Sequence, residues 1–126
     1  ASTGGRVFAH VHNGNLSNGI AFTAATFDGT PMDAAYAARR ARWEPIMEIT
    51  QVKGDGETHP YLSPDDEFAD FERWDVANLD GSAPKKKEML RYEYGRSALL
   101  TGLEVEAKVG VVPVIVEWAS SVSGSL

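Results

Sequence analysis

Two histidines separated by one residue are the first group in this chain whose types and spacing could do chemistry. His10 and His12 follow a short apolar run, Val7 to Ala9, and precede a polar loop that ends at Gly19. This pattern is typical of a buried strand that ends at a surface turn. Because side chains alternate faces along a strand, both imidazoles are predicted to point the same way and could share one metal ion.

A carboxylate stands in the middle of the next predicted strand, Ile46 to Val52, which is rich in β-branched residues. Period two places Glu48 on the same face as Ile46 and Thr50. A buried carboxylate has to be paired, hydrogen-bonded or bound to a metal, because leaving it unpaired is costly. The alternative is an edge strand with Glu48 in water, and the sequence leaves both open.

The loop that follows, Lys53 to Pro60, holds three further donors: Asp55, Glu57 and His59. Oxygen and imidazole groups this close together could contribute to a metal site. The spacing does not fit a calcium loop of the EF-hand type, which needs more acids at fixed positions. A solvated polar loop is the alternative interpretation.

Helices must connect and position these segments. We expect helices over Met32–Trp43, with Thr30 as N-cap, over Glu67–Trp74, and over about Pro84–Val109, the last ended by Gly110. The apolar stripe of the last helix is predicted to comprise Met89, Tyr92, Leu99, Leu103 and Ala107. A final apolar strand is expected over Val111–Trp118, before a small polar tail. This order predicts an α/β fold with a small parallel sheet flanked by helices.

Composition narrows the classes of protein that are possible. The chain has 126 residues, a formal net charge of −6 and no cysteine, so it is most simply one domain without disulfides or thiolate metal sites. The acidic balance argues against nucleic acid or an anionic membrane as the main partner. We interpret the one basic cluster, Lys85 to Lys87, as a solvated helix start. With no apolar run as long as a membrane span and no signal-peptide pattern, we expect a soluble protein, cytoplasmic or periplasmic.

Several blocks together resemble a known family. They are HNGNLSNG, the run RARWEP followed by KGDGETHP, LSPDDEFADFE and NLDG. In this order they resemble the bacterial family labelled domain of unknown function 3604, whose relatives are the PHP (polymerase and histidinol phosphatase) metallohydrolases. The resemblance covers about residues 6–110, and residues 111–126 form an atypical tail. It implies part of a PHP-like (β/α) barrel, whose strand ends would hold divalent metals, Mn, Zn or Fe.

The resemblance also implies roles for individual residues. His12 matches a family histidine that would be a metal ligand, whereas His10 stands where the family has an apolar residue. Glu48 and the loop with Asp55, Glu57 and His59 match blocks near the family's site, which implies catalytic roles for them. The family's first and last metal motifs have no counterpart in this chain.

Two functions from different classes follow. The first is a metal-dependent hydrolase acting on a small phosphoester, in which His12 and His10 bind the metal and Glu48, Asp55, Glu57 and His59 serve catalysis. The second is a non-catalytic fragment that forms a homo-oligomer or is completed by the missing barrel segments. The open edges of a small sheet, which invite pairing, favour the second.

Overall fold

A central strand organises the fold in the computed structural model, which describes residues 4–5, 7–51, 54–113 and 117–120. Strand β2 (Ile46–Gln51) pairs with β1 (His10–Val11) and β4 (Glu117–Ser120), both parallel to it. Strand β3 (Gly54–Asp55) pairs with the end of β2 in the antiparallel sense. The sheet is therefore mixed, and the prediction of a parallel sheet is wrong in this respect.

The reversal after β2 has a local cause. Gly54 has φ +111°, a conformation that side chains disfavour, and a Cβ there would lie 2.6 Å from the carbonyl oxygen of Glu72. Glycine lets the chain turn back and place β3 against both β2 and the segment around Glu72, whose carbonyl accepts a hydrogen bond from the Asp55 N–H at 2.9 Å. The α/β class is confirmed, whereas a barrel fragment is not.

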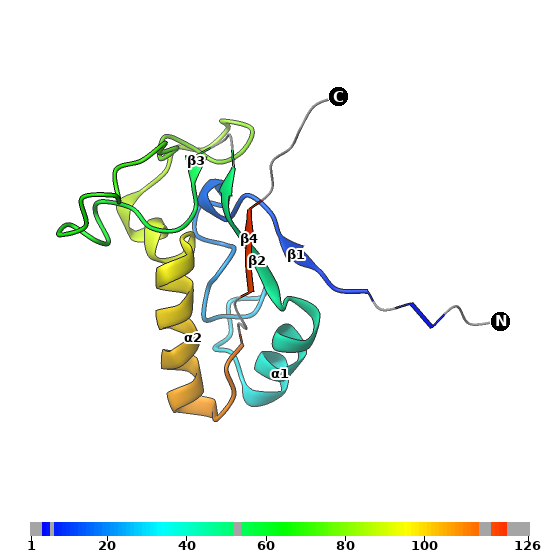
Figure 1. The fold of residues 1–126 in the computed structure, drawn as a ribbon. Coiled ribbons are helices and arrows are strands. Elements are labelled where there is room, and N and C mark those ends of the chain that lie inside the picture. The colour runs from blue at the N-terminus through cyan, green and yellow to red at the C-terminus, as the bar shows by residue number, and fades with distance from the viewer. Residues whose placement is uncertain (1–3, 6, 52–53, 114–116, 121–126) are drawn as a thin grey trace.

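Two helices lie beside the sheet (Figure 1): α1 (Ala34–Trp43) and α2 (Gly95–Val109). Helix α1 begins later than predicted because Asp33, not Thr30, is its N-cap, and the Asp33 side chain accepts from the Tyr36 N–H at 2.7 Å. The Thr30 side chain instead bonds Asp28 in the preceding turn. The predicted end of α2 is confirmed, since Gly110 adopts the left-handed conformation typical of a helix C-terminus.

The long helix predicted from Pro84 is interrupted. A 3-10 helix, η2 (Lys87–Tyr92), precedes α2, and Tyr94 between them is extended. The interruption allows the backbone of Gly95 to pack within contact distance of Ile49 and Met47 on β2. The predicted apolar stripe is wrong as well. The buried residues of α2 are Gly95, Ala98, Thr101, Gly102 and Val105, while Leu99, Leu100 and Leu103 are exposed.

The predicted helix over Glu67–Trp74 is absent, and this segment forms turns and bends. Asp66 accepts from the Phe68 N–H, and Glu72 has a positive φ of 46°, which a helix does not allow. The aromatic residues of this segment are exposed: Phe68, Phe71 and Trp74. In Figure 1 the connection from 56 to 86 consists largely of loops at one end of the molecule.

Among the described residues, the core contains two small clusters. One joins Phe22 to Met47 and Ile49 of β2 and to Ala98 of α2. The other joins Met32, Ala37 of α1 and Val105 of α2. Among the described helices, none is long and apolar enough to cross a membrane.

Two further predictions concern the strand ends. Val7 to Ala9, predicted as a buried strand, are exposed and lie before β1. The final strand begins at Glu117, and Val111 to Pro113 are not part of it. Residues 114–116 and 52–53, which fall within the predicted strand and loop, lie outside the described residues.

Candidate functional site

The carboxyl end of β1 carries a histidine held by a buried carboxylate. His12 follows β1 directly, and its Nδ1 lies 3.0 Å from Oε2 of Glu48 on the adjacent strand β2. The Glu48 side chain is only 3% exposed, whereas that of His12 is 53% exposed. The backbone N–H of Asn13 donates to the same carboxylate oxygen at 3.0 Å. Of the two alternatives for Glu48, the buried and hydrogen-bonded one is correct.

This contact determines which ring nitrogen of a neutral His12 carries the proton. An ionised carboxylate only accepts hydrogen bonds, so the proton of a neutral His12 resides on Nδ1. The other nitrogen, Nε2, then keeps its lone pair and can accept a proton or bind a metal ion. Metal-binding histidines commonly donate their second ring nitrogen to a carboxylate in this manner.

His10 lies next to His12 on the exposed side of the same strand. Their ring centroids are 6.1 Å apart, with an angle of 44° between the ring planes. The prediction that the two imidazoles neighbour one another agrees with this geometry. Among the described residues, however, no three histidine, aspartate or glutamate side chains gather where they could hold a metal. The two histidines and Glu48 therefore do not form such a group in the described part of the chain.

The loop donors predicted for the same site are engaged elsewhere. Asp55 is buried and accepts from the N–H groups of Glu57 at 2.9 Å and Thr58 at 3.4 Å. Burial raises the pKa of the Asp55 carboxyl, and these two hydrogen bonds oppose that effect only in part. Asp55 thus stabilises the loop from within.

Glu57 faces the start of α2 rather than the histidines. Its Oε1 accepts from Nε and from one terminal nitrogen of Arg96, at 2.9 and 2.7 Å. The other terminal nitrogen of Arg96 donates to Asp66 at 2.6 Å. The residue that sequence reasoning missed is Arg96, which joins two acidic loops, and no local pattern distinguishes it from an ordinary helix arginine.

His59 has both ring nitrogens in use. Its Nδ1 accepts from the Tyr61 N–H at 3.0 Å, so its Nε2 carries the proton and donates to Asp75 at 3.0 Å. The hydrogen bond from His59 lowers the pKa of Asp75. In this arrangement His59 has no lone pair left for a metal ion, although no observation tests its predicted catalytic role directly.

Comparison with known proteins places the chain in a family. The family model described as "Protein of unknown function (DUF3604)" matches residues 1–121, and the chain therefore belongs to this family. The family's description names no activity. Neither the curated proteins nor the solved structures contain a match to this chain.

Proposed function

We propose that this chain carries part of the metal centre of a phosphoester hydrolase related to the PHP metallohydrolases. The observation that carries the proposal is the buried Glu48 carboxylate, whose Oε2 lies 3.0 Å from Nδ1 of the half-exposed His12 and leaves Nε2 outside this contact. In open α/β sheets, sites form at the carboxyl ends of parallel strands, which is where His12 lies.

His12 is the ligand in this proposal, Glu48 positions it, and His10 is the neighbouring imidazole. A divalent ion bound there would activate water and stabilise charge on a phosphoryl group. Catalytic zinc sites use three protein ligands. We therefore expect the described residues to bind the ion without sustaining turnover until further donors complete the site.

Calorimetric titration of metal-free protein with Zn²⁺ and Mn²⁺ tests this proposal. We expect His12→Ala to weaken binding at least about tenfold, and Glu48→Gln to weaken it about 10- to 100-fold, as is usual for a carboxylate that orients a ligand. The matched control is Glu106→Gln, which removes an exposed carboxylate on α2 and should leave the affinity unchanged. Unaltered binding by the His12→Ala protein would contradict the proposal.

A second candidate, self-association, is favoured by a different observation. Val7 and Phe8, which lead into β1, are 80% and 52% exposed. Within the described part of the chain β1 pairs only with β2, so its other edge is open. We propose that a second copy of this chain covers that edge, and the oligomeric state in solution tests this proposal.

A further inference from the structure

Three consecutive lysines, the last of which begins η2, line one cavity, and Lys86 and Lys87 among them are exposed. The cavity has a volume of about 250 Å³. Its lining comprises His59, Tyr61, Asp75, Lys85, Lys86, Lys87 and Leu90. Since a water molecule occupies about 30 Å³ in the liquid, the cavity is large enough for a tetrahedral oxyanion.

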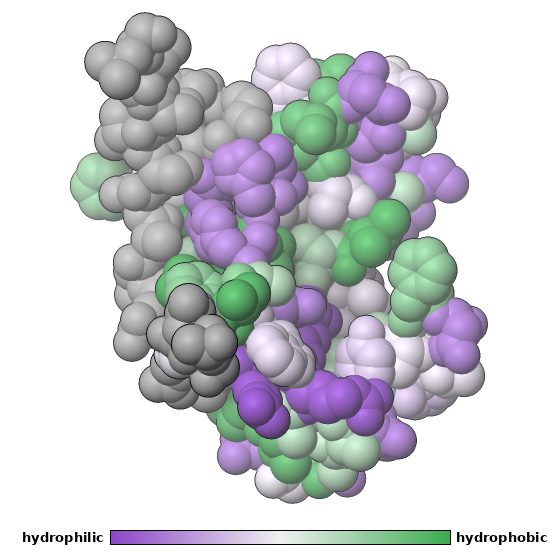
Figure 2. All heavy atoms as spheres, turned by 90° about the vertical axis from the view of Figure 1, so that its right-hand side faces the viewer, coloured by the Kyte–Doolittle hydropathy of each residue, from purple (hydrophilic) through white to green (hydrophobic). Residues whose placement is uncertain are grey.

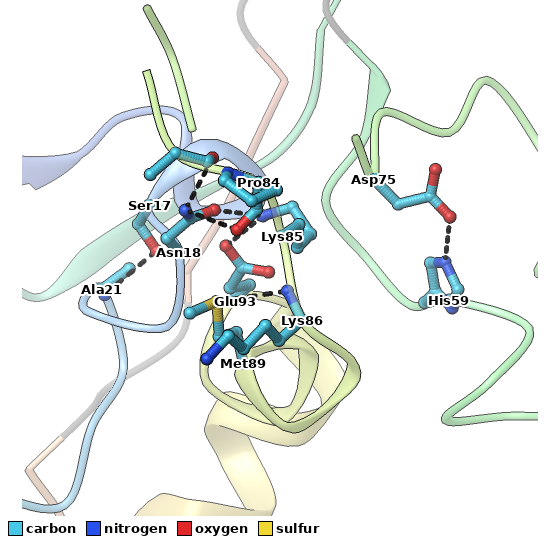
Figure 3. Close-up of polar contacts among 11 residues, drawn as sticks. Ser17, Asn18, Ala21, His59, Asp75, Pro84, Lys85, Lys86, Met89 and Glu93 are labelled. Atoms are coloured by element: carbon cyan, nitrogen blue, oxygen red, sulfur yellow. Dashed lines mark hydrogen bonds and ion pairs between the residues drawn. The ribbon is translucent and has the colours of Figure 1, made fainter. Parts of the chain in front are cut away.

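Lys85 is the buried member of this group. Its side chain is 2% exposed, and its Nζ lies 2.5 Å from Oε1 of the fully buried Glu93 and 3.3 Å from Oδ1 of Asn18. Figure 3 shows this network on one side and the His59–Asp75 pair on the other. The interpretation of Lys85 as a solvated residue is therefore wrong.

The ammonium group of Lys85 has a donor to spare. A lysine ammonium has three N–H donors, and the described residues provide acceptors for two of them, on Glu93 and Asn18. A buried donor without a partner is unfavourable. Lys85 lines the cavity, while its side chain is almost fully buried against Glu93 and Asn18.

The charge around the cavity favours an anion. Glu93 neutralises Lys85, while neither Lys86 nor Lys87 has a carboxylate within ion-pair distance in the described part of the structure. Lys87 lies over the ring of Tyr61 at 5.4 Å. Asp75 is the one carboxylate of the lining and accepts a hydrogen bond from His59, so the charges of Lys86 and Lys87 together exceed that of Asp75.

A second cavity adjoins the first. It has a volume of about 400 Å³ and shares Tyr61 and Lys87 with it. Its lining adds the apolar side chains of Leu62 and Leu100, together with Ser97, Glu88 and the pair that Arg91 forms with Glu104. A ligand with its anionic end among the lysines could therefore place an organic group beside Tyr61 and these leucines.

We propose that the first cavity binds the phosphate group of a small phosphomonoester, whose organic part occupies the second. Lys86 and Lys87 supply the attracting charge, since charge-assisted hydrogen bonds to phosphate oxygens are strong. The site uses none of the residues of the His12–Glu48 pair, so it does not depend on the proposed metal centre.

The test is a calorimetric titration with two probes, inorganic phosphate and phenyl phosphate. The His12→Ala protein, freed of metal, is used so that binding through a metal ion does not contribute. We expect phenyl phosphate to bind more tightly than phosphate, and Lys86→Gln/Lys87→Gln to weaken both at least about tenfold.

The control for net charge is Arg39→Gln/Arg42→Gln, which removes the same charge from exposed positions on α1 and should leave both affinities within about twofold. Absence of phosphate binding, or an equal loss in the two double variants, would overturn the proposed site. Equal affinity for the two probes would overturn the role of the second cavity and identify free phosphate as the ligand.

Discussion

At the scale of single residues, the contact between His12 and Glu48 is the one with chemical consequences. It leaves Nε2 of His12 able to accept a proton or bind a metal ion. The sequence predicted strand positions for both residues. The alternation of side chains along β2 left open whether the Glu48 carboxylate is buried and paired or exposed to water. It could not show that Glu48 is buried, because burial depends on β1 and β4, which come from opposite ends of the chain. The local sequence pattern therefore could not identify the partner of Glu48.

The same limit applies to His59. Its place in a loop with Asp55 and Glu57 suggested a shared site, yet its partner is Asp75, sixteen residues further on. Nothing in the sequence between them specifies that pairing. His59 is thus a buried histidine that accepts a hydrogen bond from the backbone N–H of Tyr61 and donates one to the Asp75 carboxylate.

The His59–Asp75 contact makes a prediction about acid stability. The hydrogen bond lowers the pKa of Asp75 in the folded protein. The contact therefore stabilises the folded state above the pKa of an unfolded aspartate, about 3.9, and this stabilisation is lost as the pH falls below that value. We expect Asp75→Asn to lower the melting temperature at pH 6. We also expect the melting temperature of this variant to fall less between pH 5 and pH 3 than that of the wild type.

The control for this experiment is Asp65→Asn, which removes an exposed carboxylate from the same loop region. Asp55 acts in the opposite sense, because burial raises the pKa of its carboxyl and protonation therefore favours the folded state. Asp55 is present in both Asp75→Asn and the wild type, so its effect on stability does not contribute to the difference between them. An unchanged acid dependence in Asp75→Asn would refute the stabilising role of the pair.

At the scale of elements, the segments with strong local signals were predicted best. The alanine-rich run became α1, and the β-branched run became β2, each within about two residues of the expected bounds. The failures occurred where tertiary contacts override propensity. The single helix predicted over about Pro84–Val109 is interrupted at Tyr94, before Gly95, where a Cβ would lie 2.7 Å from Cδ1 of Ile49.

The open edge of β1 leads to a prediction about self-association. Exposed strand edges are templates for pairing with another chain, and the face of the molecule shown in Figure 2 carries hydrophobic surface among hydrophilic areas. We expect light scattering with size-exclusion chromatography to show a dimer at micromolar concentration. Phe8→Lys should convert it to monomer, because a charge at the edge opposes pairing.

Phe27→Lys provides the matched control for that experiment. Phe27 is fully exposed in the loop before α1, so its replacement introduces the same charge away from the β1 edge. We expect this variant to remain dimeric. A monomeric wild-type protein, or dissociation of both variants alike, would exclude the β1 edge as the contact.

At the scale of the whole molecule, the α/β class followed from the order of elements, while the mixed sheet did not. Whether a short segment pairs parallel or antiparallel depends on the turn before it, and the reversal at Gly54 brings β3 back against β2. The predicted donors are likewise dispersed over the fold. His10, His12 and Glu48 lie at the β1 end, whereas Asp55 ends β3 and Glu57 and His59 belong to the loop that follows it.

The charged residues are also distributed unevenly over the molecule. The chain is acidic overall, with a formal net charge of −6, yet three lysines gather around one cavity. A sum over the sequence bears on a large anionic partner and says little about a small one, because short-range contacts at a local cluster outweigh distant charges screened by salt. The two proposed sites therefore use different chemistry, imidazole and carboxylate at one and ammonium groups at the other.

The most direct test of the central claim is nitrogen-15 NMR of the histidine side chains during titration with Zn²⁺. The account predicts that the neutral His12 ring carries its proton on Nδ1 and that Zn²⁺ shifts the Nε2 resonance, with both features lost in Glu48→Gln. A proton on Nε2 of His12, or no response of that nitrogen to the metal, would contradict a histidine held by Glu48 for metal binding.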